Sequence, residues 1–438
     1  MENKFIGIKA SELCNGLINN TINLDEYIEE TLAVIDAKDC EICAMLPEPN
    51  RRERIFYEAR KLRELYHEPG MRPPLYGLLV GVKDLFSVDG LPTQAGSKLP
   101  AEAFAGCESE VVTKLKALGA IVLGKTVSTE FAYFSPGATR NPLNLGHTPG
   151  GSSSGSAAAV AAGYCHVALG TQTIASIIRP ASFCGVFGFK PSWGQVSAKG
   201  VFPFSQSADH VGIICKYYED MEFVARHLME QHTTGSTDSM KCFGIATGTY
   251  IEQAGKSVLA NFNNTVTALK NKGIKVIELD VFGDIDKIND SHRKLIAAEF
   301  ASNHKDLYSQ YSQLYSTASK ELIALGMDVS PVELTQCQKA QIMLREHICG
   351  LMAAERIDAW ISPSTTSTAP IGLSSTGSPL MSLPWTNAGL PSITIPNAKD
   401  SKGLAFGLQL VGRYGFDLSI LSNEVFSLII HLAIDDAK

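Results

Sequence analysis

Residues 146–197 read GHTPGGSSSGSAAAVAAGYCHVALGTQTIASIIRPASFCGVFGFKPSWGQVS, and this stretch indicates how the chain folds. It is rich in Gly, Ser and Ala, but flexible linkers of that composition lack apolar runs. Here a small-residue segment predicts a tightly packed helix over 154–163. A short strand at 167–169 and a second apolar segment ending at Phe189 and Lys190 follow. Because small residues let backbones approach closely, two serine-bearing loops can meet in a protected interior.

The flanking sequence alternates between helical and strand patterns. Helices are expected within 11–38 and 51–67, from 109 to 118, near 251–272 and over most of 285–356, with a closing helix at 417–435. Strands are expected at 75–83, 121–123, 243–246, 275–279, 393–395 and 406–410, and the polar segment 231–240 is expected to be a surface loop. The alternation predicts an α/β layered fold. We expect one domain over residues 1–438, with N-terminal helices at 11–67, a core at about 75–220 and a specificity-shaping helical segment at about 285–356.

Composition excludes several classes of protein. The 438 residues are 45% hydrophobic and 19% charged, with a formal net charge of -7, so a large core is expected and a nucleic-acid partner is not. The sequence contains no run of eighteen apolar residues, so no membrane span is expected. Ten scattered cysteines are typical of a reducing cytoplasm. Cys40 and Cys43 form a CxxC pair that is either a redox or metal pair or two small buried residues. The lack of a second such pair favours the latter, and no metal or cofactor is expected.

Three motifs carry a resemblance to a known family. GLLVGVKDLF at 77–86, GGSSSGSAAAVAAG at 150–163 and the segment LGTQTIASIIRPASFCGVFGFKPS at 169–192 resemble the amidase signature family of serine hydrolases. The resemblance covers nearly the whole chain, and within the family it is closest to the malonamidase type. It implies one α/β/α domain with a central mixed sheet of about ten or more strands flanked by helices.

The resemblance also assigns a catalytic triad. Ser176 is implied as the nucleophile, Ser152 as the bridging serine, which the family usually holds by a cis peptide bond, and Lys83 as the base. Lysine acts as a base only when neutral, so its pKa must be depressed by burial, and Lys83 ends an apolar strand. Taken alone, Lys83 is better interpreted as an ordinary strand-end lysine, and each serine fits a cap or turn residue as well as a catalytic one. The three motifs together, in this order, favour the catalytic interpretation. Ser153 and Ser154 are expected to support the site by hydrogen bonds or as a helix cap.

The oxyanion hole implied by the family consists of the backbone N–H groups of Ile174, Ala175 and Ser176. The family has Gly-Gly where this chain has Ile174-Ala175. If those glycines serve a positive φ, the loop here must change or carry strain. If the glycines only leave space for the substrate, the backbone N–H donors are kept and the larger side chains make the acyl pocket smaller.

A second departure lies beside the nucleophile. Most family members carry Asp four residues before the nucleophile and Arg two after it, whereas this chain has neutral Gln172 and the shifted Arg179. An arginine without a nearby acid is free to bind a substrate carboxylate by a two-pronged contact, as in the malonamidase type. We therefore expect Arg179, Gln172 and Ser153 to contact substrate. The alternative is that Arg179 caps a helix or pairs with a core acid such as Asp209.

The sequence thus favours a cytoplasmic amidase that hydrolyses a small, carboxylate-bearing amide through an acyl-enzyme, without cofactor, and that could form a homodimer. One alternative is an amidotransferase-type or biosynthetic acyl-transfer enzyme, which would share the triad. Another is a family member that no longer catalyses and serves as a binding or scaffold protein, because Ile174-Ala175 replaces Gly-Gly.

Overall fold

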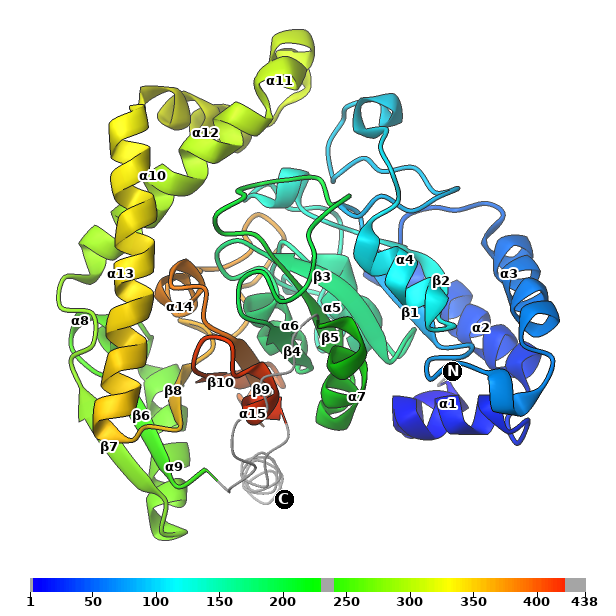
Figure 1. Ribbon diagram of the computed structural model, residues 1–438, viewed down its shortest axis with the longest axis horizontal. Helices are drawn as coiled ribbons and strands as arrows, with labels where there is room; N and C mark the ends of the chain where they lie inside the picture. Colours follow the sequence, from blue (N-terminus) through cyan, green and yellow to red (C-terminus); the bar gives the residue numbers. More distant parts are fainter. Residues whose placement is uncertain (1–2, 230–239, 422–438) are drawn as a thin grey trace.

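A computed structural model describes residues 3–229 and 240–421, and within them ten strands form one mixed sheet between layers of helices (Figure 1). The strand order is β2-β1-β3-β5-β4-β9-β10-β8-β6-β7. The strands are β1 (Leu79–Lys83), β2 (Ile121–Thr126), β3 (Val167–Gln172), β4 (Phe187–Lys190), β5 (His210–Cys215), β6 (Cys242–Ala246), β7 (Lys275–Leu279), β8 (Ala359–Pro363), β9 (Ser392–Lys399) and β10 (Ala405–Val411). The predicted α/β fold with a central mixed sheet is confirmed.

Helices cover both faces and both ends of the sheet (Figure 1). They are α1 (Ala10–Ile18), α2 (Leu24–Ile42), α3 (Arg51–Leu65), α4 (Glu110–Ala117), α5 (Ser154–Ala161), α6 (Ile178–Cys184), α7 (Tyr218–Leu228), α8 (Thr249–Glu252), α9 (Lys256–Asn271), α10 (Ile285–Asn303), α11 (Lys305–Tyr311), α12 (Thr317–Asp328), α13 (Pro331–Glu355), α14 (Leu383–Asn387) and α15 (Asp417–Leu421). Of the described helices, none is long and apolar enough to cross a membrane.

Several expected boundaries shift. The strand expected at 75–83 begins only at Leu79, and the one expected at 167–169 continues to Gln172, because it pairs with β5 along its whole length. The helix expected near 251–272 is broken into α8 and α9 at Gly255, whose N–H donates to the carbonyl of Thr366 at 2.8 Å. The expected closing helix is described only as α15, since residues 422–435 lie outside the described residues, as does most of the expected loop at 231–240.

The site-bearing segments meet at one edge of the sheet. β1 pairs in parallel with both β2 and β3, and Val82 lies opposite Leu169. The carboxyl ends of parallel strands share an edge, which is where α/β folds place their functional loops. Lys83 at the end of β1 therefore lies next to the loop that leaves β3 at Gln172.

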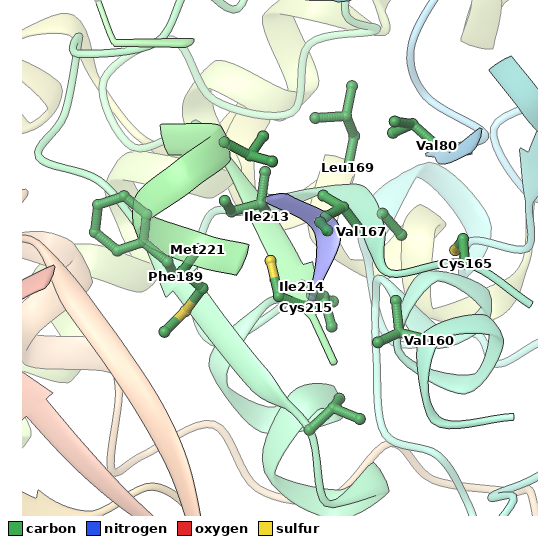
Figure 2. Close-up of a cluster of buried hydrophobic side chains, with 14 of the residues drawn as sticks. Val80, Val160, Cys165, Val167, Leu169, Phe189, Ile213, Ile214, Cys215 and Met221 are labelled. Carbon is green, nitrogen blue, oxygen red and sulfur yellow. The ribbon is translucent and has the colours of Figure 1, made fainter. Parts of the chain in front are cut away.

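A buried apolar cluster holds these strands in place (Figure 2). Val167 and Leu169 of β3, Ile213 of β5 and Val160 of α5 are each at most 2% exposed. The expected small-residue helix is confirmed as α5, whose packing explains its composition. A Cβ on Gly155 would lie 2.3 Å from both the carbonyl oxygen of Ala44 and the amide nitrogen of Val127. Such contacts are too short for any other residue, so α5 approaches the neighbouring backbone as closely as the sequence implies.

The segment expected to be helical at 285–356 consists of α10 to α13. Figure 1 shows α10, α12 and α13 at the opposite side of the sheet from the N-terminal helices α1 to α3. α10 packs against α12, α13 and α14. The division of the chain into N-terminal helices, core and specificity segment stays a prediction.

Candidate active site

The side chain of Lys83 lies in a closed polar cluster at the end of β1. Its Nζ donates to Ser152 Oγ and to Thr171 Oγ1, both at 2.7 Å. Lys83 is fully buried, and burial holds the pKa of its ammonium well below the ordinary lysine value, although Asp209 opposes that shift. Since the neutral amine is the form that accepts a proton, this environment favours a base.

The two serine loops are joined through Ser153. Its N–H donates to the carbonyl oxygen of Ser176 at 3.2 Å, and its Oγ donates to the carbonyl oxygen of Thr171 at 3.2 Å. The peptide bond between Gly151 and Ser152 is cis. Lys83, Ser152 and the Ser176 backbone are thus brought together from three segments that are far apart in sequence. Ser153 joins the loops, so these bonds give it a supporting position and no contact open to substrate.

The loop before Ser176 presents free backbone donors. Over residues 3–229 and 240–421, the N–H groups of Ile174, Ala175 and Ser176 find no acceptor, and neither does the hydroxyl of Ser176. Neither Ile174 nor Ala175 has a positive φ. Replacing Gly-Gly by Ile174-Ala175 therefore puts no side chain into the left-handed region of backbone conformation. Of the two alternatives, strain in the loop or a smaller acyl pocket, this backbone is compatible with the second.

Gln172 holds the nucleophile loop in place. Its Oε1 accepts from the N–H groups of Ile177 and Ile178 at 2.8 and 2.9 Å, and its Nε2 donates to Thr386 Oγ1 at 2.9 Å. Both ends of the amide are used inside the protein, and Gln172 is 1% exposed. The expected contact of Gln172 with substrate is therefore not supported. A neutral amide fits this position because it can accept from the two N–H groups and donate to Thr386 together.

Arg179 is a buried cation without a carboxylate partner among the described residues. Its Nη2 and Nε donate to the carbonyl oxygen of Gly151 at 2.8 and 3.2 Å, and its Nη1 donates to that of Gly377 at 2.5 Å. Burial lowers the pKa of Arg179 to about 9. The alternative pairing of Arg179 with Asp209 does not occur, because Asp209 accepts instead from Thr173 Oγ1 at 2.6 Å.

Two neighbours of the site escaped sequence reasoning, and a third was given another partner. Thr171 is the second acceptor of Lys83, and His292 of α10 places its Nε2 3.0 Å from the carbonyl oxygen of Thr173. Asp209, considered from sequence only as a partner of Arg179, accepts from Thr173. Thr171 lies inside the GTQT motif and could have been found there, whereas His292 comes from a distant segment with no local signal. Among the described residues, no cluster of three His, Cys, Asp or Glu side chains could hold a metal ion.

The mixed sheet and the buried contact between Lys83 and Ser152 can be compared with known proteins. Residues 28–421 match the family described as Amidase, and the chain belongs to that family. The protein is therefore an enzyme that acts on amide carbon–nitrogen bonds.

Individual relatives support the same assignment. The chain is 31% identical over 457 residues to a component of the glutamyl-tRNA(Gln) amidotransferase from Prochlorococcus marinus (strain MIT 9211), covering 90% of this chain and 91% of the relative. A solved structure described as a crystal structure of amidase superposes with a TM-score of 0.86 at 28% identity, covering 98% of this chain and 99% of the other. Another, from a vestigial protein complex bearing on the origins of an s-triazine catabolic enzyme, gives a TM-score of 0.83 at 27% identity, covering 98% of each chain.

These relatives bear on the finer predictions. Membership of the amidase family is confirmed, but the likeness to the malonamidase type receives no specific support. Because the relative from Prochlorococcus marinus is named as part of an amidotransferase, the comparisons favour the amidotransferase alternative over the small-amide hydrolase. The expected homodimer and cytoplasmic location stay predictions.

Proposed function

We propose that the protein cleaves amides by a Ser176–Ser152–Lys83 relay. The observation that carries this proposal is the 2.7 Å contact between Lys83 Nζ and Ser152 Oγ in a fully buried setting. It lies beside a loop whose serine hydroxyl and N–H groups have no acceptor in the part of the chain that the structure describes. A serine hydroxyl becomes a useful nucleophile only when a neighbouring base takes its proton.

The reaction consists of the formation of an acyl-enzyme on Ser176 and its hydrolysis. Ser176 Oγ attacks the amide carbon and gives its proton to Ser152 Oγ, which passes its own proton to Lys83 Nζ. The oxyanion accepts from the N–H groups of Ile174, Ala175 and Ser176. The carbon–nitrogen bond then breaks, and the proton returns from Lys83 through Ser152 to the leaving nitrogen. Water then attacks the ester carbon on Ser176 and gives its proton through Ser152 to Lys83. The bond between the acyl carbon and Ser176 Oγ breaks, the proton returns through Ser152 to Ser176 Oγ, and the acid is released.

We propose that the substrate carries a carboxylate close to its amide. Arg179 supports this because its positive charge is buried and its hydrogen-bond acceptors within residues 3–229 and 240–421 are carbonyl oxygens, so an anion bound by its two remaining N–H groups would gain a strong, two-pronged contact. The Phe134 ring, 5.8 Å from the guanidinium carbon, adds an apolar wall beside the charge. Ile174 narrows the acyl pocket, which favours a small acyl group.

The amidotransferase type is the second candidate, and the named relatives favour it. In that case the amide is glutamine, whose α-carboxylate would contact Arg179, and the released ammonia would be used by a partner. The two candidates share the relay and differ in the distance between carboxylate and amide.

The first experiment tests the relay. The full-length protein is treated with a fluorophosphonate probe, and the modified residue is located by mass spectrometry. Labelling of Ser176 that disappears in Ser176→Ala, Ser152→Ala and Lys83→Met supports the proposal. Labelling that persists in Lys83→Met refutes it, and absence of labelling in the native protein favours the non-catalytic alternative, a binding or scaffold protein.

The second experiment separates the substrates. Ammonia release is measured with malonamate, glutamine and a neutral aliphatic amide of equal length. Preference for malonamate supports the small-amide hydrolase, preference for glutamine supports the amidotransferase type, and preference for the neutral amide refutes the role of Arg179.

A further inference from the structure

Asp209 is the carboxylate that adjoins the nucleophile loop. It lies just before β5 and is partly buried. Its Oδ1 accepts from Thr173 Oγ1 at 2.6 Å, and its Oδ2 accepts from the N–H groups of Phe204 and Ser205 at 2.8 and 3.0 Å. No cation forms an ion pair with it among the described residues. Its negative charge is held in place by neutral donors and is not cancelled.

Asp209 lines one small cavity together with Thr171, a hydrogen-bond partner of Lys83. The cavity offers about 10 Å³ to a water-sized sphere, which is room for about one water molecule, and Thr171, Thr173, Asp209 and His210 are among its lining residues. Thr171 Oγ1 is also the acceptor that lies 2.7 Å from Lys83 Nζ. Thr173, the cavity and Thr171 thus connect the carboxylate to the base, and the charge of Asp209 acts on Lys83 through this largely buried region.

We propose that Asp209 is a positioning residue that keeps Lys83 basic enough to take the proton from the serine relay. This inference rests on the proposed function of Lys83. The neutral Gln172 stands where most of the family carries an acid. Asp209 therefore supplies the negative charge beside the nucleophile loop in this chain.

The other charged groups around Lys83 leave Asp209 as the dominant partner. Asp84 is neutralised by Lys125 at 2.8 Å, and burial lowers the pKa values of His210 and His292, so both rings are neutral. Glu299 accepts from Ser205 and Ser207, neither of which is a hydrogen-bond partner of Lys83. The remaining buried cations of this region, Arg179 and Lys190, donate to backbone carbonyl groups elsewhere.

The shifts in the pKa values of Asp209 and Lys83 agree with this role. Burial raises the pKa of Asp209 to about 6, so the carboxylate is ionised above that pH. Burial lowers the pKa of Lys83, and the charge of Asp209 counteracts part of this effect. Loss of that charge therefore makes Lys83 neutral at lower pH, but a weaker base.

The test is the pH dependence of fluorophosphonate labelling of Ser176 in the full-length protein. The labelling rate rises with pH as Lys83 loses its proton, and the midpoint reports that step. Asp209→Asn should move the midpoint down by about one pH unit, the usual effect of an opposite charge nearby. Glu299→Gln, which neutralises a carboxylate held by Ser205 and Ser207 and absent from the influences on Lys83, is the matched control and should not lower the midpoint.

Thr173→Val keeps the test decisive if Asp209→Asn does not fold. Loss of the Thr173 hydrogen bond raises the pKa of Asp209, so the carboxylate stays neutral to higher pH and the labelling midpoint falls. An unchanged midpoint in the folded variants overturns the role of Asp209, as does an equal fall in Glu299→Gln. If Ser176 of the native protein is never labelled, the proposed function and this inference fail together, whereas labelling with an unshifted midpoint overturns this inference alone.

Discussion

Replacement of Arg179 by Ala tests the substrate class most directly. The guanidinium is 3% exposed and makes three hydrogen bonds, two to Gly151 and one to Gly377. A two-pronged contact with a substrate carboxylate consists of two charge-assisted hydrogen bonds, each worth about 1.5–3 kcal/mol. Removing that contact should cost about 3–6 kcal/mol, which corresponds to a roughly 150- to 20,000-fold loss of kcat/KM for an acidic amide, at about 1.4 kcal/mol per tenfold.

The same substitution also frees the Gly151 carbonyl group, which precedes Ser152. That loss affects every substrate alike, and we expect it to lower kcat/KM for a neutral amide by about tenfold, the equivalent of one hydrogen bond. Arg179→Lys keeps the positive charge but loses the paired N–H groups of the guanidinium. It should therefore retain only part of the native preference for acidic amides.

The assay is kcat/KM for an acidic and a neutral amide of equal length, measured for native protein, both Arg179 variants and Arg345→Ala. Arg345 is a matched control because its Nε also supports a loop carbonyl group, that of Ala388, at 2.7 Å. Its loss should not change the ratio of the two substrates. Equal losses on acidic and neutral amides in Arg179→Ala would refute recognition of a carboxylate by Arg179.

Three further outcomes follow from the geometry. Gln172→Leu leaves two buried N–H groups without an acceptor and should lower the free energy of unfolding by about 3 kcal/mol, measured by urea titration; Gln172→Glu, which keeps an acceptor, should cost less, and equal costs would contradict this account. His292→Ala removes the bond to the Thr173 carbonyl group and should lower kcat by about tenfold with little change in KM; an effect on KM alone would argue against a positioning role. Burial lowers the pKa of His166 from 6.5 to about 4, so the unfolded chain binds the proton more readily and the free energy of unfolding should fall as pH drops below about 6.5, by about 2 kcal/mol at pH 5. Denaturant titrations at pH 8 and pH 5 should show a smaller fall in His166→Gln, and an identical fall would disprove this contribution.

Much of the site could be anticipated because its chemistry is concentrated in short motifs. Lys83 and Ser152 each lie in a stretch whose residue types are unusual together, and the structure brings these two residues into contact. The α/β class followed from alternating periodicities, which reflect local backbone geometry. Helix α5 was predictable for a similar reason, because a run of small residues has few other uses in a buried segment.

Long-range contacts could not be predicted, because no short motif in the sequence marks them. His292 of α10 contacts the nucleophile loop from more than a hundred residues away, and nothing near it in sequence marks that partner. The effect of Ile174-Ala175 also depended on φ, which residue identity restricts but does not fix. Gln172 looked available to substrate until its three partners were located.

By itself, the sequence determined the family, the layered class and the residues capable of the chemistry, because those depend on composition and local spacing. The tertiary structure alone decided how these residues are used. Only the packing of distant strands and loops shows that Lys83 is stripped of water, that Arg179 has no carboxylate beside it among the described residues, and that Asp209 shares a cavity with Thr171. Burial and the distance between charges set proton affinities, and both are properties of the folded chain as a whole.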